Sequence, residues 1–94
     1  MIYLAAKQKV ENYDKWKLVF DEHGAQRRAH GSKGAKIFRD TDDPNKLVII
    51  TKWVDVKTAK DFAYSRDLRV AMKNAGVIGL PELYFLEELE TEDY

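Results

Sequence analysis

Leu47-Val-Ile-Ile-Thr-Lys-Trp-Val54 is the stretch that decides the fold, because it is apolar on both faces. Side chains alternate sides along a β-strand. One face of this strand therefore carries Leu47, Ile49 and Trp53, and the other carries Val48, Ile50 and Val54. The stretch predicts a central strand that is buried on both sides.

The length and composition predict one globular domain over residues 1–94, with an acidic tail at 90–94. Hydrophobic residues are 45% of the chain and charged residues 34%, which is a normal balance for a folded protein. The 16 basic and 16 acidic residues cancel, so the chain lacks the basic character expected of a partner of nucleic acid or of an anionic membrane. We therefore expect neither partner.

Localisation is predicted from features that the sequence lacks. No apolar run approaches the roughly 20 residues of a membrane span, and the first residues do not resemble a secretory signal. The chain has no cysteine, so it cannot form disulfides or thiolate metal sites. These observations favour a cytoplasmic protein.

Six elements are expected along the chain. Strands are predicted at 2–10, 33–39, 47–54 and 82–89, and helical stretches at 12–30 and 55–75, the second interrupted at Ser65. Asn12, Asp55 and Ser65 are predicted helix N-caps. Gly31 and Gly76 are predicted to end the helices.

The order β-α-β-β-α-β predicts a ferredoxin-like α+β fold, a four-stranded antiparallel sheet with two helices on one face. The first and third strands are expected in the centre. The second face of the sheet is then apolar and uncovered, and Tyr84, Phe85 and Leu86 give an edge strand two apolar faces as well. A second copy of the same chain would cover it, so we expect a homodimer.

The first helical stretch carries one apolar arc, which at about 100° per residue contains Tyr13, Trp16, Val19, Phe20, His23, Arg27 and His30. His23 lies near the centre of this arc. It is either a core histidine bonded to a hydroxyl or carbonyl, or a pocket residue that can move a proton. Arg27 is either a helix-end cation with its stem packed on apolar surface, or a ligand for a substrate carboxylate.

Four further residues are candidates for the space between the second helical stretch and the sheet: Trp53, Phe62, Tyr64 and Met72. Such residues form either a plain core or the wall of a pocket. Other sites are not supported by the spacing. His23 and His30 are about 10 Å apart along a helix, too far to share a metal unaided. The sequence contains no phosphate-binding loop or serine triad, and we expect no cofactor.

An RNA-recognition module has the same order of elements and is a competing interpretation. That module stacks RNA bases on aromatic side chains of its two central strands. Here the third strand is aliphatic until Trp53, and Tyr3 is the only aromatic residue of the first strand. RNA binding is therefore not expected.

Short motifs through most of the chain support a family resemblance: Val10–Trp16, Phe20–His23, Gly31–Gly34, Asp42–Asn45, Trp53, Ala75–Val77, Pro81 and Tyr84–Glu87. Together they resemble the dimeric α/β-barrel superfamily, and within it the small domains grouped with antibiotic-biosynthesis monooxygenases. The resemblance implies a homodimer whose two sheets face each other, with a ligand cavity between the helices and sheet of each protomer. It implies pocket roles for His23, Trp53 and Phe62.

The sequence departs from the catalytic branches of that family. The oxygenases often carry a histidine in the second helix, shortly after the tryptophan that ends the strand, and Asp61–Ser65 contains none. The haem-degrading enzymes use an asparagine near the pocket, and the first two strands offer none. The likeness is therefore to a branch apart from the well-studied enzymes.

The functional hypothesis is a small homodimeric domain that binds an apolar, aromatic small molecule beneath the first helix. Its chemistry would be proton transfer or cofactor-independent oxygenation, with His23 as base and Arg27 orienting an anionic group. The expected ligand-binding residues are Trp16, Phe20, Trp53, Phe62 and Met72. The alternative is a non-catalytic dimeric module of ligand-binding or structural role, in which His23 is purely structural. A filled space beside His23 favours this alternative, and a cavity of a few hundred Å³ favours the first hypothesis.

Overall fold

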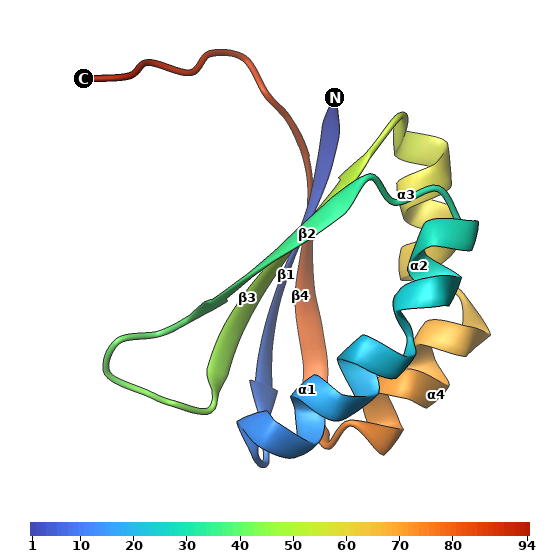
Figure 1. Ribbon diagram of the computed structural model, residues 1–94, viewed down its shortest axis with the longest axis vertical. Helices are drawn as coiled ribbons and strands as arrows, with labels where there is room; N and C mark the ends of the chain where they lie inside the picture. The colour runs from blue at the N-terminus through green and yellow to red at the C-terminus, as the bar shows by residue number, and fades with distance from the viewer.

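The structure, a computed structural model of residues 1–94, contains one sheet covered by helices on one side (Figure 1). Its elements in chain order are β1 (Ile2–Val10), α1 (Tyr13–Glu22), α2 (Gly24–Ala29), β2 (Gly34–Arg39), β3 (Lys46–Trp53), α3 (Val56–Ala63), α4 (Arg66–Asn74) and β4 (Val77–Glu87). None of these helices is both long and apolar enough to cross a membrane.

The four strands are antiparallel and lie in the order β2-β3-β1-β4. This is the predicted ferredoxin-like α+β arrangement, with β1 and β3 in the centre. The apolar strand β3 is central because both of its faces need cover, whereas the short, charged β2 lies at an edge.

The three predicted N-caps are confirmed by hydrogen bonds. The side-chain oxygen of Asn12 accepts from the amide of Lys15 at 2.9 Å, and that of Asp55 accepts from the amide of Thr58 at 2.8 Å. The Ser65 hydroxyl accepts from the amide of Leu68 at 3.2 Å. Each bond satisfies an amide that has no partner within its own helix, which fixes where α1, α3 and α4 begin.

The single helix predicted over 12–30 is wrong, because the chain forms α1 and α2 with a break at His23. The backbone of His23 has φ −82° and ψ 0°, outside the usual helical range. Its amide still donates to the Val19 carbonyl at 3.0 Å, so the chain bends without losing all helical hydrogen bonds. Gly24, a weak helix former, follows directly and makes this bend inexpensive.

The predicted start of the last strand is also wrong, since β4 begins at Val77 rather than at Glu82. Val77 and Ile78 pair with the end of β1, and the register then shifts before Glu82 pairs with Lys7. Gly79, with φ +70°, supplies the backbone conformation that this β-bulge requires. The turn-like composition of the segment marks a bulge within a strand and not a loop before one.

The core between helices and sheet consists of two clusters of buried residues. One contains Leu4, Trp53, Ala59, Phe62 and Ala63. The other contains Val10, Trp16, Leu47, Ile49 and Ala75. No residue of α4 is fully buried, so this helix covers the sheet less tightly than α3 does.

The opposite side of the sheet, which we call the open face, carries no helix (Figure 1). The strand register places these apolar side chains on it: Tyr3, Ala5, Phe38, Val48, Ile50, Tyr84 and Leu86. Phe38, Tyr84 and Leu86 are each nearly half exposed, at 49%, 45% and 47%. A contiguous apolar surface of this kind is typical of an interaction site.

The chain beyond Glu87 has no helix or strand and runs away from the sheet (Figure 1). Leu89 and Tyr94 are almost wholly exposed. We expect removal of residues 91–94 to change the melting temperature by less than about 3 °C, because exposed ends bury little surface. Thermal unfolding of full-length and truncated protein measures the difference. A loss of many degrees would show that the tail packs on something in solution.

Candidate functional site

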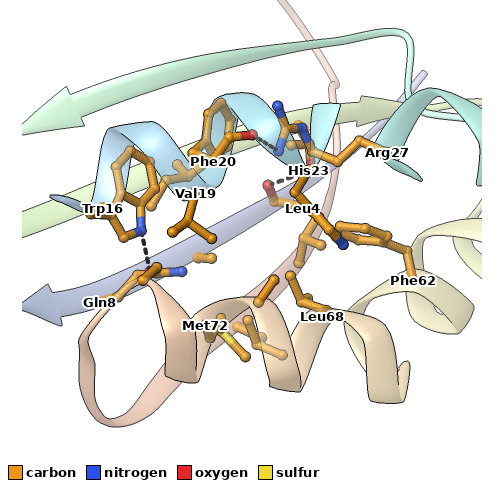
Figure 2. A pocket seen from close by; sticks show the side chains of 16 residues that line it. Leu4, Gln8, Trp16, Val19, Phe20, His23, Arg27, Phe62, Leu68 and Met72 are labelled. Carbon is orange, nitrogen blue, oxygen red and sulfur yellow. Dashed lines mark hydrogen bonds between the residues drawn. The ribbon is translucent and has the colours of Figure 1, made fainter. Parts of the chain in front are cut away.

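A cavity of about 70 Å³ lies between the helices and the sheet (Figure 2). Twelve of its 16 lining residues are hydrophobic, so a bound molecule would have to be largely apolar. β1 and β3 form its floor, α1 and α4 form its walls, and Phe62 from α3 closes one end. Both core clusters contribute to the wall, so the cavity occupies the space between them.

The cavity brings together six of the seven residues that the sequence analysis assigned to a site. These are Trp16, Phe20, His23, Arg27, Phe62 and Met72. Trp53 is the exception: it is fully buried in the core, where its indole Nε1 donates to the Thr51 hydroxyl at 2.8 Å. Tyr64 is 63% exposed and contacts the ring of Phe85 instead.

His23 has an unusual environment for a core histidine. Its Nε2 atom is buried and has no hydrogen-bond partner. The imidazole lies 5.9 Å from the ring of Phe62, measured between centroids. The predicted core interpretation requires a neighbouring hydroxyl or carbonyl as partner for this nitrogen, and the structure has none. Buried polar atoms without partners are rare in folded proteins, and they often mark functional positions.

The surroundings of His23 keep the imidazole neutral. Burial lowers its pKa below the ordinary value of 6.5, and the positive charge of Arg27 lowers it further. Asp67 acts in the opposite direction, but its effect is smaller than these two. A neutral imidazole has one nitrogen with a free lone pair, which is what a general base requires.

Arg27 is held against Phe20 by two interactions. Its guanidinium carbon lies 3.5 Å from the centroid of the Phe20 ring, and its Nη1 atom donates to the Phe20 carbonyl at 2.8 Å. The first contact is a cation–π interaction. Burial lowers the pKa of Arg27, and Asp21 opposes this effect. The guanidinium thus lies at the rim of the cavity in a fixed orientation (Figure 2).

Two polar residues of the cavity wall were missed by the sequence analysis. Gln8 lies on β1, where its side-chain oxygen accepts a hydrogen bond from the Trp16 indole at 3.2 Å. Thr51 lies on β3. Strand alternation could have found both, since Gln8 shares a face with Leu4 and Ala6, and Thr51 shares one with Ile49 and Trp53. A polar residue on an otherwise apolar inner face was the available signal.

The size of the cavity limits what it can hold without movement. An engineered apolar cavity of about 150 Å³ accommodates benzene. The cavity here has about half that volume, and it is smaller than the few hundred Å³ expected of a ligand pocket. A single aromatic ring therefore enters only if a wall side chain moves. Met72 on the loosely packed α4 is suited to this, because its side chain is flexible.

No metal centre is formed by the side chains. The structure contains no group of three or more His, Asp or Glu residues placed to hold one ion. His23 and His30 both contact Phe62 but lie at opposite ends of α2.

Comparison with solved structures identifies the fold. A protein of Bordetella bronchiseptica proposed to be an antibiotic biosynthesis monooxygenase superimposes with a TM-score of 0.78 at 18% identity, over 95% of this chain and 97% of that one. SnoaB, a cofactor-independent oxygenase from Streptomyces nogalater, gives 0.77 at 16% identity, over 96% and 94%. This chain has the fold of the antibiotic biosynthesis monooxygenases.

The same fold extends to other proteins. A conserved protein from Methanosarcina mazei Go1 matches with a TM-score of 0.73 at 13% identity, over 94% of this chain and 92% of that one. No family model and no curated protein matches the sequence. The resemblance noted in the sequence is therefore confirmed at the level of the fold.

The lowered pKa of His23 predicts a dependence of stability on pH. Below about pH 6.5 the unfolded chain binds a proton at this imidazole that the folded chain disfavours, so the free energy of unfolding falls as the pH falls. We expect the loss of stability between about pH 8 and pH 5.5 to be smaller in His23→Asn than in the wild type. Denaturant unfolding at several pH values measures it. His30→Asn, which retains His23 and removes only the smallest of the effects that lower its pKa, is the matched control. An unchanged pH profile in His23→Asn would contradict the prediction.

Proposed function

We propose that this protein is a homodimeric domain that binds a small apolar, aromatic molecule in the cavity and removes a proton from it with His23. The observation that carries the proposal is the buried Nε2 atom of His23, which has no partner and borders an apolar cavity. A ligand with an acidic O–H or C–H would supply that partner.

The proton transfer has a simple physical basis. In the tautomer with its proton on Nδ1, the Nε2 lone pair of His23 is free to accept a proton from the bound molecule. The bond from hydrogen to substrate breaks, its electron pair stays on the substrate, and the imidazole becomes a cation. Arg27 stabilises the resulting anion across the rim of the cavity, because its charge is fixed there and partly shielded from water.

Cofactor-independent oxygenation would be a continuation of the same step. An electron-rich aromatic anion can react directly with dioxygen, so a site that only removes an acidic O–H or C–H proton from an aromatic molecule can begin such a reaction. The fold shared with SnoaB, a cofactor-independent oxygenase, supports this direction. Among the residues of the site, only His23 supports cofactor-independent oxygenation.

One observation favours a second function, that of a non-catalytic dimeric module. The cavity holds about 70 Å³, which is little for a substrate. In that case the cavity is a packing defect under the loosely packed α4, and His23 has a structural role only. A direct assay of proton removal separates the two functions.

We expect the wild-type protein to accelerate exchange of the benzylic hydrogens of phenylacetone with D₂O, since that molecule combines one ring with a weakly acidic C–H. His23→Ala should lower the accelerated rate by about 10²–10⁴-fold, the usual contribution of a general base. Loss of the signal in ¹H NMR spectra follows the exchange. His30→Ala, a second imidazole that contacts Phe62, is the matched control and should retain the rate.

The stability of His23→Ala provides a further test. A residue bordering a cavity should be replaced at little cost, whereas a packed core residue should lose on the order of 2–4 kcal/mol. A loss of stability of that size, together with no exchange by the wild type and no binding of phenylacetone, would refute the catalytic proposal. The non-catalytic dimeric module would then be the remaining function.

The dimer is supported by the open face. Its apolar side chains span all four strands, and no part of the same chain covers them. The open face also carries charged residues of both signs. The ammonium group of Lys7 lies 4.0 Å from the carboxylate of Glu82. A face of this kind can pack on its own copy about a two-fold axis.

We expect sedimentation at micromolar concentration to show one species of twice the chain mass. Ile50→Lys should convert it to a monomer, because the new ammonium would lie in the middle of the open face beside Lys36, the residue paired with Ile50 on β2. Leu18→Lys is the control. Leu18 lies on α1 and is 66% exposed, so this variant should remain dimeric. A well-folded wild-type monomer would rule the dimer out.

A further inference from the structure

A second hollow, of about 430 Å³, adjoins the cavity on the side of α2 and β2. Its wall is polar where that of the cavity is apolar, and it contains three cations, Arg27, Arg28 and Lys33. Arg27 belongs to both walls. The apolar cavity and the basic hollow therefore meet at one guanidinium group.

The two arginines converge on one point in this hollow. A Cβ atom at Gly24 would lie 3.4 Å from Nη2 of Arg27 and 3.5 Å from Nη1 of Arg28. The two guanidinium groups are consequently close to each other, although like charges repel. The positive charge of Arg28 contributes to the lowered pKa of Arg27. Both side chains therefore lie against the backbone of Gly24, at ordinary contact distance from where a Cβ atom would be.

No carboxylate of the protein forms an ion pair with these cations. Arg27, Arg28 and Lys33 take part in none of the ion pairs of the structure. Asp21, the acid that acts on Arg27, is already bonded to Lys17 by contacts of 2.6 and 2.7 Å. The convergent cations are therefore unpaired, and an anion between them would relieve their repulsion.

From this arrangement we infer that the basic hollow binds the carboxylate of an amphipathic ligand whose apolar part occupies the cavity. The inference rests on the proposed function, since it uses the same cavity. Guanidinium groups present planar pairs of N–H donors that match a carboxylate. The Nη1 atom of Arg27 is engaged with Phe20, and its Nη2 atom lies beside Gly24, another residue of the hollow's wall. One end of a small aromatic acid thus meets Arg27 and Arg28 while its ring enters beside His23.

Binding of phenylacetate and of phenylacetamide, its neutral counterpart, tests this inference by calorimetry in low-salt buffer. We expect the wild type to bind the acid about tenfold or more tightly than the amide, as charge-assisted hydrogen bonds are stronger than neutral ones. Arg28→Gln and Lys33→Gln should each reduce this preference, because the acid loses more affinity than the amide. Both side chains are exposed, so the fold should tolerate these changes.

Lys36→Gln is the matched control. It removes the same charge from β2, but Lys36 lies on the open face, on the other side of the sheet from the hollow. This variant should keep the full preference for the acid. A uniform loss in all three variants would mean that only the net charge matters, which contradicts a defined site.

The remaining outcomes are separable. If phenylacetamide binds and phenylacetate binds no more tightly, the anion site is refuted and the proposed apolar pocket stands. If acetate alone binds as tightly as phenylacetate, the hollow does not act together with the cavity, and the inference is again refuted. If neither aromatic compound binds, both this inference and the proposed pocket fail.

Discussion

The apolar character of both faces of β3 is the constraint on which the rest of this structure depends. Leu47, Ile49, Thr51 and Trp53 point toward the helices and are all buried. Val48 and Ile50 point the other way and remain partly exposed. The helices of one chain can cover only one face, so the strand that organises the internal core also creates the open face. The internal fold and the external surface thus have the same origin.

On the covered face, the division of the core into two clusters explains why a cavity exists. α3 packs its buried residues Ala59, Phe62 and Ala63 around Trp53, and α1 packs Trp16 over the far end of β3. The bend at His23 and the loose packing of α4 leave the middle unfilled. His23 lies at that gap with a nitrogen that no protein group satisfies. A buried polar atom next to empty space is costly in free energy, and such strain is common where a ligand completes the site.

The sequence predicted the architecture because its signals there are local and repeated. Alternation along β3, three N-caps and the order of elements were enough for the sheet order and the face covered by helices. The bend at His23 was missed, since the apolar arc continues through it and no proline interrupts the helix. The early start of β4 was missed because Gly79 and Pro81 are typical of a turn as well as of a bulge.

The candidate site could be predicted only in part, for a related reason. Most residues of the apolar arc of the first helix do line the cavity, because helical periodicity determines which way they point, but Tyr13 and His30 of the same arc do not. The size of the cavity and the missing partner of His23 depend on how α4 packs, and no short sequence pattern encodes that. The convergence of Arg27 and Arg28 over Gly24 is likewise a matter of side-chain placement. Arg27 and Arg28 are consecutive residues, so their side chains leave the helix in directions about 100° apart.

The bulge in β4 has a consequence for how the molecule avoids unwanted association. β4 is an edge strand, and edge strands expose backbone groups that can recruit further strands and lead to aggregation. Pro81 has no amide hydrogen, and the irregular backbone around Gly79 breaks the regular spacing that an added strand would need. The other edge, β2, is only six residues long and carries Lys36 and Arg39. Growth by strand addition is therefore discouraged at both edges of the sheet, and contact through the face is left as the route for self-association.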